Sequence, residues 1–218
     1  MALHGFRSRR FRDRRAAGRT LAAQLDGMRD QDVVVLALPR GGVPVAFEVA
    51  EHLGAPLDVI VVRKLGLPLQ PEMAMGAIGE NGVRFVDERL VASAGVRPQQ
   101  LAAIEAAERE ELDRRVRRYR GDRPGVSLQA KTALVVDDGI ATGSTARAAA
   151  TVARLAGASA VVVAAPVGPR DVVERLGDAV DSVVLVMQPD PFVAIGGFYD
   201  DFTQTTDEEV RTLLGVSR

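Results

Sequence analysis

Five short runs of the chain are almost wholly apolar, and they constrain the fold more than any other feature of the sequence. A strand with one face in water alternates apolar and polar residues, whereas a parallel strand covered by helices on both faces is apolar throughout. A run such as "DVVVLAL" therefore predicts a strand buried on both faces. The five predicted strands cover residues 32–38, 57–64, 131–138, 159–167 and 181–187.

Helical patterns follow most of these runs. The first run is followed by "GGVPVAFEVAEHLG" (41–54), in which Pro44 is tolerated because it falls in the first helical turn. Further helices are predicted at 144–157 and 169–177, after the third and fourth strands. Strands and helices alternate in this way in a doubly wound parallel sheet, so we predict an α/β fold with a Rossmann-like core.

The other segments are predicted from local patterns. Alanine and leucine at helical spacing indicate a helix within 15–28, and good helix formers predict a long helix at 97–120, whose charges we interpret as a solvated face. Residues 65–76 contain two prolines and no clear period, which indicates a long loop. Residues 76–88 are predicted to form a hairpin that turns at Asn81-Gly82.

The length of 218 residues predicts a single domain spanning residues 1–218. The tail after residue 187 lies outside the alternation of strands and helices. We expect this tail to pack with the N-terminal segment. In that arrangement, residues 30–187 form the core, and residues 1–30 and 188–218 form a small cap, or hood.

Composition excludes several classes of protein. The chain has no cysteine, so it has no disulfide or thiol chemistry, and its two histidines do not suggest a zinc site or a histidine-based triad. No apolar run reaches the roughly 20 residues of a membrane span, and no apolar signal core follows the N-terminal arginines. We therefore expect a cytoplasmic protein without membrane association.

The charge of the chain disfavours non-specific binding of nucleic acid, because the net charge is −1 at pH 7. The exception is the arginine-rich segment "RSRRFRDRR" (7–15). We interpret it as a solvated arm or the start of a helix. A local patch that binds anions or RNA is the alternative.

The candidate site is the stretch "ALVVDDGIATGST", residues 133–145. Asp137 and Asp138 follow a predicted buried strand, and open parallel sheets bind ligands at this end of their strands. Residues 141–145 then open a helix, where free N–H groups, the helix dipole and three hydroxyls favour a phosphate. The neighbouring carboxylates would accept hydrogen bonds from vicinal hydroxyls. A ribose 5-phosphate combines these groups.

Other interpretations of this stretch fit less well. A Walker A loop requires Gly-Lys-Ser/Thr, whereas this chain has Gly143-Ser144-Thr145. A dinucleotide-binding fold requires a glycine fingerprint after the first strand, which "PRGGVPVA" (39–46) does not supply. If the two acids were incidental to a capped helix, their mutual repulsion would cost stability without a partner.

The same thirteen residues resemble, at every position, the signature by which type I phosphoribosyltransferases bind PRPP (5-phosphoribosyl 1-diphosphate). "LPRGG" (38–42) resembles the pyrophosphate-binding loop of that family. "VVRKLG" (61–66) resembles its second-strand basic pair, which is followed by a mobile loop that closes over the site. The order of elements is similar over about 30–190. The segments "FRDRRAAGRTLA" and "FYDDF" resemble a bacterial subgroup of the family.

The resemblance implies transfer of ribose 5-phosphate from PRPP to a nitrogen acceptor, usually a nucleobase, with release of pyrophosphate and with Mg²⁺ as the cofactor. It assigns the ribose hydroxyls to Asp137 and Asp138, and it implies a strained or cis peptide in the pyrophosphate loop. The predicted loop 65–76 has no lysine or arginine to meet pyrophosphate. The other implied residues are Ala141, Thr142, Gly143, Ser144 and Thr145 for the 5′-phosphate, and Arg40, Gly41, Gly42, Arg63 and Lys64 for pyrophosphate.

The resemblance leaves the acceptor open. Family members that use 6-oxopurines have an acid where this chain has Ala141, and a lysine near the end of the next strand, which here reads "AAPV" (164–167). Both differences disfavour hypoxanthine and guanine. By a looser similarity, Phe192 and Val193 would contact the acceptor and Asp200 would face the metal. The alternative is that Phe192 belongs to the core of the cap.

Two other functions use the same fold. A regulator that senses PRPP would keep the site and bind RNA or DNA elsewhere, but no helix-turn-helix precedes the fold. A PRPP-synthesising or phosphohydrolase relative would need an ATP site, and the sequence contains no sign of one. For an enzyme, the implied partners are PRPP and an acceptor base, without nucleic acid. The resemblance also allows a homodimer.

Overall fold

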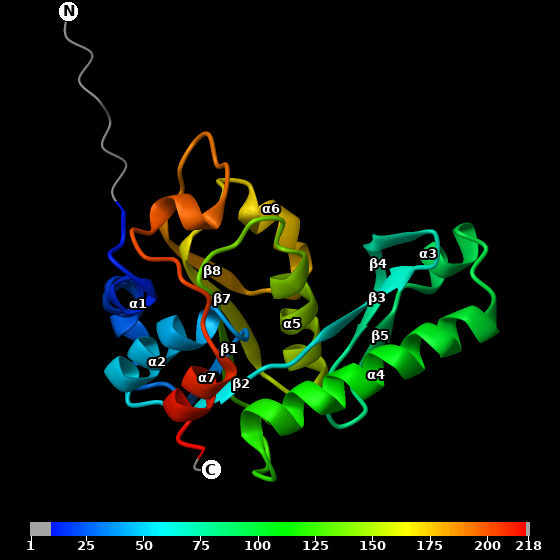
Figure 1. Cartoon of the computed structure of the whole chain (residues 1–218), viewed down its shortest axis with the longest axis horizontal. Helices are drawn as coiled ribbons and strands as arrows, with labels where there is room; N and C mark the ends of the chain where they lie inside the picture. Colours follow the sequence, from blue (N-terminus) through cyan, green and yellow to red (C-terminus); the bar gives the residue numbers. More distant parts are fainter. Residues whose placement is uncertain (1–9, 217–218) are drawn as a thin grey trace, which may run out of the picture.

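The computed structural model describes residues 10–216, and a sheet of five parallel strands lies at its centre (Figure 1). The strand order is β2-β1-β6-β7-β8. Ala37 at the end of β1 lies opposite Val136 at the end of β6, so the carboxyl ends of these two strands are neighbours. The strands are β1 (Val33–Ala37), β2 (Leu57–Val59), β6 (Thr132–Val136), β7 (Ala160–Val167) and β8 (Ser182–Met187).

The apolar runs form strands because alternate residues enter two separate cores. In β1, the side chains of Val33, Val35 and Ala37 pack in one core, and those of Val34 and Leu36 pack in the other. The first core contains residues of α1 (Arg14–Ala22) and α2 (Gly42–Leu53), and the second contains residues of α5 (Ser144–Leu155) and α6 (Val172–Leu176). Helices thus cover both faces of the sheet, which confirms the predicted doubly wound α/β class.

A second sheet projects from the core together with a long helix (Figure 1). We call residues 63–120 the arm. Its three antiparallel strands, in the order β3-β4-β5, are followed by two helices. The predicted turn at Asn81 and Gly82 is confirmed, since both residues have positive φ between β4 and β5. The elements of the arm are β3 (Arg63–Leu67), β4 (Gln70–Ile78), β5 (Arg84–Val86), α3 (Glu88–Ser93) and α4 (Pro98–Arg120).

Two predictions for this region are wrong. The run 57–64 is not one strand, because β2 ends at Val59 and β3 belongs to the other sheet. The connecting residues Ile60 and Val61 are apolar because they pack into the two cores. The predicted loop 65–76 is most of the β3–β4 hairpin. Its register shifts on both sides of Gly66, so the sequence lacks the period of two that would mark a strand.

The arm is fixed to the core by a buried ion network. Arg120, the last residue of α4, is only 4% exposed, and its Nε donates to Oδ1 of Asp58 in β2 at 2.9 Å. The same guanidinium pairs with Glu80 in the β4–β5 turn and donates to the carbonyl oxygen of Val59. Because removal of one partner would leave an unpaired buried charge, the network holds these three segments together.

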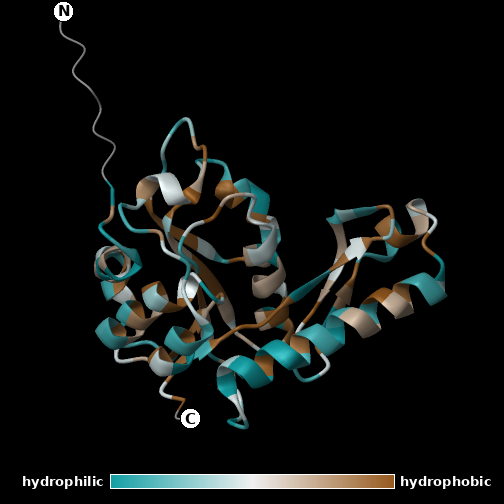
Figure 2. Ribbon diagram, in the orientation of Figure 1, coloured by the Kyte–Doolittle hydropathy of each residue, from teal (hydrophilic) through white to brown (hydrophobic). Residues whose placement is uncertain are grey.

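The remaining length of α4 alternates hydrophilic and hydrophobic residues (Figure 2). Its apolar residues, such as Leu112, pack toward the core, while many of its charged residues are exposed. The predicted solvated face is therefore present, with Arg120 as an exception.

The two ends of the described chain lie together. Phe11 forms a parallel bridge with Tyr199, and both belong to an apolar cluster that includes Ala17 and Val167. The division into a core and a cap stays a prediction, and residues 1–9 and 217–218 of that cap lie outside the described residues. The remaining elements are η1 (Ala23–Met28), η2 (Gly177–Ala179), η3 (Ile195–Phe198) and α7 (Asp207–Leu213).

The helices of residues 10–216 differ from membrane spans, since none of them combines the length and the apolar character that crossing a bilayer requires.

Candidate functional site

Asp137 and Asp138 follow β6 directly, at the edge of the sheet where β1 also ends. The backbone N–H of Asp138 donates to Oδ1 of Asp137 at 2.8 Å, and Asp138 is 8% exposed. Burial raises the pKa of both carboxyl groups, and the charge of Asp138 raises the pKa of Asp137 further. Two adjacent carboxylates, with Asp138 buried and Asp137 partly buried, form a site whose charge favours hydroxyl donors or a cation.

The loop between β1 and α2 lies against these carboxylates. A Cβ atom on Gly41 would lie 2.1 Å from Oδ2 of Asp138, and one on Gly42 would lie 2.6 Å from the carbonyl oxygen of Val136. Both distances are far shorter than a van der Waals contact, so the close approach of loop and carboxylates requires glycine at both positions. The peptide between Pro39 and Arg40 is cis, as the resemblance implies.

Arg14, the first residue of α1, is part of this site, although sequence reasoning did not identify it. Its Nε donates to Oδ2 of Asp138 at 2.7 Å, and the two side chains are only 10% and 11% exposed. Its guanidinium also lies 4.0 Å from the centroid of the Phe202 ring. The only signal in the sequence was the arginine-rich segment 7–15, in which nothing distinguishes Arg14 from its neighbours. Residues 7–9 of that segment lie outside the described residues.

Two further contacts connect the C-terminal tail to the site. The hydroxyl of Tyr199 donates to the carbonyl oxygen of Asp138 at 2.6 Å, and burial raises the pKa of this phenol. Arg14 donates to the carbonyl oxygen of Thr203 at 2.7 Å. The first helix and the tail therefore meet at Asp138, which orients its carboxylate.

We expect Arg14→Gln to lower the free energy of unfolding by about 2–4 kcal/mol, because the substitution leaves Asp138 beside Asp137 without its cationic partner. The loss should shrink as the pH falls, since protonation of Asp138 removes the need for that partner. Urea denaturation at neutral and at mildly acidic pH measures both effects.

The control for this prediction is Arg15→Gln in the same helix. Arg15 is about half exposed, and its partner Glu48 also pairs with Arg19. Its loss should therefore cost less than about 1 kcal/mol. Equal losses for the two variants would contradict the role given to Arg14.

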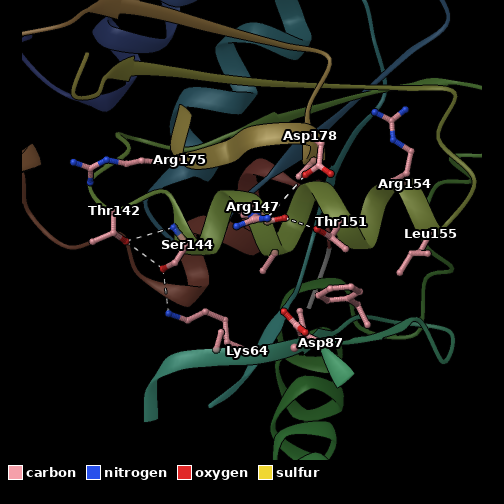
Figure 3. A pocket seen from close by; sticks show the side chains of 16 residues that line it. Lys64, Asp87, Thr142, Ser144, Arg147, Thr151, Arg154, Leu155, Arg175 and Asp178 are labelled. Atoms are coloured by element: carbon pink, nitrogen blue, oxygen red, sulfur yellow. Dashed lines mark hydrogen bonds and ion pairs between the residues drawn. The ribbon is translucent and has the colours of Figure 1, made fainter. Parts of the chain in front are cut away.

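Residues 141–145 form the turn from β6 into α5. Gly143 has φ 80°, a left-handed conformation that side chains disfavour, and α5 begins at the next residue. The hydroxyls of Thr142 and Ser144 lie 3.2 Å apart (Figure 3). The free N–H groups at the start of this twelve-residue helix, together with these hydroxyls, suit a phosphate.

Lys64 of the arm contacts the turn formed by residues 141–145. Its Nζ donates to Oγ of Ser144 at 3.2 Å (Figure 3). The resemblance grouped Lys64 with the pyrophosphate residues, whereas the structure brings it to the residues implied for the 5′-phosphate. A cavity of about 630 Å³ extends from this point between α5 and the arm, with Phe85 and Leu155 among its walls.

The other predicted residues have partners elsewhere. Arg63 pairs with Glu108 of α4. Phe192 stacks on Phe198 with the ring centroids 5.9 Å apart, and Val193 is 85% exposed. Asp200 pairs with Nε of Arg10 at 3.3 Å. Their assignments to pyrophosphate, acceptor and metal stay predictions. Within residues 10–216, no group of three histidine, cysteine, aspartate or glutamate residues could hold a metal on its own.

A second cavity, of about 820 Å³, opens beside the loop after β1 and Asp138. The end of α4 and the tail after Tyr199 complete its walls. The cavity brings together arginines from three different parts of the chain, and two carboxylates, Asp138 and Asp207, also line it. These arginines are Arg14, Arg40, Arg114, Arg115 and Arg118.

Comparisons with known proteins agree with this geometry. Residues 11–203 match the sequence model of the phosphoribosyl transferase domain. A protein of Mycobacterium tuberculosis H37Rv, provisionally named a phosphoribosyl transferase, is 52% identical over 204 residues, which are 94% of this chain and 46% of the relative. The chain thus spans about half the length of the curated relatives it matches.

A solved structure is also similar over nearly the whole chain. The crystal structure of TT1426 from Thermus thermophilus superposes with a TM-score of 0.86 at 44% sequence identity. The match covers 94% of this chain and 97% of that one. The five-stranded parallel sheet, the loops at the ends of β1 and β6 and these similarities lead to one conclusion: the chain belongs to the phosphoribosyl transferase domain family.

Proposed function

We propose that this protein transfers ribose 5-phosphate from PRPP to a nitrogen acceptor, with a nucleobase as the expected acceptor, and releases pyrophosphate. The contact between Gly41 and Asp138 is the observation that carries the proposal. It joins a glycine loop to a carboxylate pair, and residues 141–145 follow the same strand. A diphosphate, a pair of ribose hydroxyls and a phosphate monoester would each meet groups of suitable chemistry at this edge of the sheet.

In the proposed transfer, the bond from C1 of the ribose to the pyrophosphate oxygen breaks, and that oxygen keeps the electron pair. A bond from C1 to the acceptor nitrogen forms, and this nitrogen loses its proton to solvent. Between these events the ribose ring is cationic. Asp137 and Asp138 accept hydrogen bonds from the ribose hydroxyls, and their negative charge stabilises the cation. Residues 141–145 hold the 5′-phosphate, which fixes the ring in position.

Arg14 limits how Asp138 takes part. Its Nε occupies Oδ2 of Asp138, and the N–H of Asp138 occupies Oδ1 of Asp137. Oδ1 of Asp138 and Oδ2 of Asp137 are therefore the proposed acceptors for the ligand. In this proposal, Arg40 and the N–H group of Gly41 stabilise the charge of the departing pyrophosphate. The N–H of Gly42 donates to the carbonyl oxygen of Leu38 at 3.0 Å, so the predicted contribution of Gly42 is the space that its missing side chain leaves.

Magnesium suits this site as an ion that the protein and the substrate would bind together. Mg²⁺ prefers oxygen ligands and is usually bound by one or two carboxylates together with substrate phosphates, not by a cage of protein groups. Asp200 stays the residue predicted to face this ion, while Asp137 and Asp138 hold the ribose hydroxyls. When bound, the ion adds positive charge near the leaving pyrophosphate.

A panel of acceptors tests the proposal, with pyrophosphate release as the measurement. We expect release from PRPP with adenine, a pyrimidine or an amine, and none with hypoxanthine or guanine. Ala141 cannot exchange a proton with a 6-oxopurine, and β7 ends at Val167 without a lysine that could recognise the oxo group. We place the acceptor under the tail segment that contains Phe192 and Val193.

The outcomes of the panel separate the alternatives. Efficient turnover of hypoxanthine would overturn the choice of acceptor. Tight binding of PRPP without turnover of any acceptor would overturn the transferase and favour a protein that senses PRPP.

A further inference from the structure

The cavity beside the loop after β1 has a wall that the transfer described above does not use. Arg114, Arg115 and Arg118 line it from the last turns of α4. The end of this helix is fixed to the core by the buried side chain of Arg120. The wall therefore belongs to a rigid element, which holds its charges in a defined place.

Asp207 links this wall to the loop after β1. Its carboxylate, at the start of α7, pairs with Arg118 and lies 3.7 Å from a guanidinium nitrogen of Arg40. Two arginines from different elements thus share one carboxylate. Their guanidiniums are close enough to act on one ligand.

Glu111 is a carboxylate shared by the other two arginines of α4, Arg114 and Arg115. Its carboxylate accepts hydrogen bonds at 2.7 Å from Arg114 and from Arg115, and these bonds lower its pKa to about 2. The guanidiniums of Arg40, Arg114, Arg115 and Arg118 therefore pair with only two carboxylates, those of Asp207 and Glu111. This ratio leaves an excess of positive charge. The four arginine side chains are between 34% and 53% exposed, so each can still reach a ligand in the cavity.

Residues 65–76, which form most of the β3–β4 hairpin, cannot supply this charge. Glu72 is the only charged residue between positions 65 and 76, and Leu69 in the β3–β4 turn is 94% exposed. The positive charge that the arm brings to the cavity comes from α4.

We propose that Arg114, Arg115 and Arg118 bind a diphosphate group, which is held between α4 and the loop of residues 39–42. Guanidiniums suit this ligand because their planar donors match phosphate oxygens in pairs. The inference rests on the proposed function, in which the diphosphate is the leaving group of PRPP. The arginines then stabilise the negative charge that pyrophosphate gains as its bond to C1 breaks.

The test measures two ligands separately by calorimetry, inorganic pyrophosphate with Mg²⁺ and ribose 5-phosphate. The variant replaces all three arginines, Arg114→Gln, Arg115→Gln and Arg118→Gln. We expect its affinity for pyrophosphate to fall by about tenfold or more, since each lost contact is a partly exposed ion pair. The affinity for ribose 5-phosphate should stay unchanged.

Arg117→Gln is the matched control, because Arg117 lies on the same helix, is exposed and is absent from the walls of the cavity. It removes one positive charge from α4 and should change neither affinity. An equal loss of pyrophosphate binding in Arg117→Gln and in Arg118→Gln would overturn the proposal. So would a triple variant that binds pyrophosphate like the wild type or loses both ligands equally.

Glu111→Gln provides a second test that keeps every arginine. It frees Arg114 and Arg115 from their competing carboxylate, so binding of pyrophosphate should become tighter. Weaker or unchanged binding in this variant would contradict the proposal. Failure of the proposed function has a different signature: wild-type protein would bind pyrophosphate through α4 yet consume no PRPP with any acceptor.

Discussion

The double substitution Asp137→Asn with Asp138→Asn is expected to abolish binding of PRPP while the protein stays folded. Each carboxylate is a charge-assisted acceptor worth about 1.5–3 kcal/mol, so their joint loss should weaken binding by at least about a hundredfold. Calorimetry with PRPP measures the affinity, and circular dichroism checks the fold. Unchanged affinity in the double variant would contradict the assignment of the ribose site to these residues.

The single variants separate ligand binding from stability. Asp137→Asn should raise the melting temperature in the absence of ligand, because burial and the charge of Asp138 raise the pKa of Asp137 above its ordinary value. The gain should be present at alkaline pH, where the wild type carries the unfavourable charge. It should disappear as the pH falls through this raised pKa, since the folded wild type then takes up a proton. Asp138→Asn should not stabilise, because it removes the partner of Arg14.

Gly41→Ala is expected to have an effect of similar size, although it adds a single methyl group. The new Cβ would lie 2.1 Å from Oδ2 and 2.7 Å from Cγ of Asp138, so either the carboxylate or the loop must move. Oδ2 is also the atom that accepts the hydrogen bond from Arg14. We expect a loss of about 1–3 kcal/mol in the free energy of unfolding, as for other overpacked sites, together with loss of PRPP turnover.

Gly27→Ala is the control for this substitution. No atom lies within 4 Å of the Cβ position of Gly27, and its backbone is not left-handed, so the variant should be neutral or slightly more stable. If Gly41→Ala keeps the turnover and the melting temperature of the wild type, the loop of residues 39–42 can move away from Asp138. Glycine would then not be required at position 41.

The strands of the central sheet could largely be predicted because most of them are buried on both faces. Val34 and Val35 enter opposite cores, so the apolar run has no polar interruption and its length marks a strand. The same rule failed at residues 57–64. There Ile60 and Val61 are apolar because they fill the two cores while the chain passes from one sheet to the other. The hydrophobicity of a residue does not show whether it packs in a core from a connecting segment or from a hydrogen-bonded strand.

The local parts of the candidate site could also be predicted, but the contacts between distant segments could not. Asp137, Asp138 and residues 141–145 are adjacent in the chain and form a recognisable pattern. Arg14 and the arginines of α4 occur in segments where charge is abundant, and solvated and inward-facing arginines look alike in such segments. Which of these arginines face the site depends on tertiary packing. Arg14, for example, faces Asp138 only because the first helix and the tail meet there.

The strand order of the central sheet has a consequence for how this protein reaches its native state. Val35 of β1 pairs with Leu134 of β6, and the whole arm lies between them in the chain. Pairings within the arm, such as Gly76 with Val86, join residues that are close in sequence. The entropic cost of closing a loop rises with its length, and non-local pairing slows folding. We therefore expect the arm to form early, and the edge that unites Gly41 with Asp138 to be completed late.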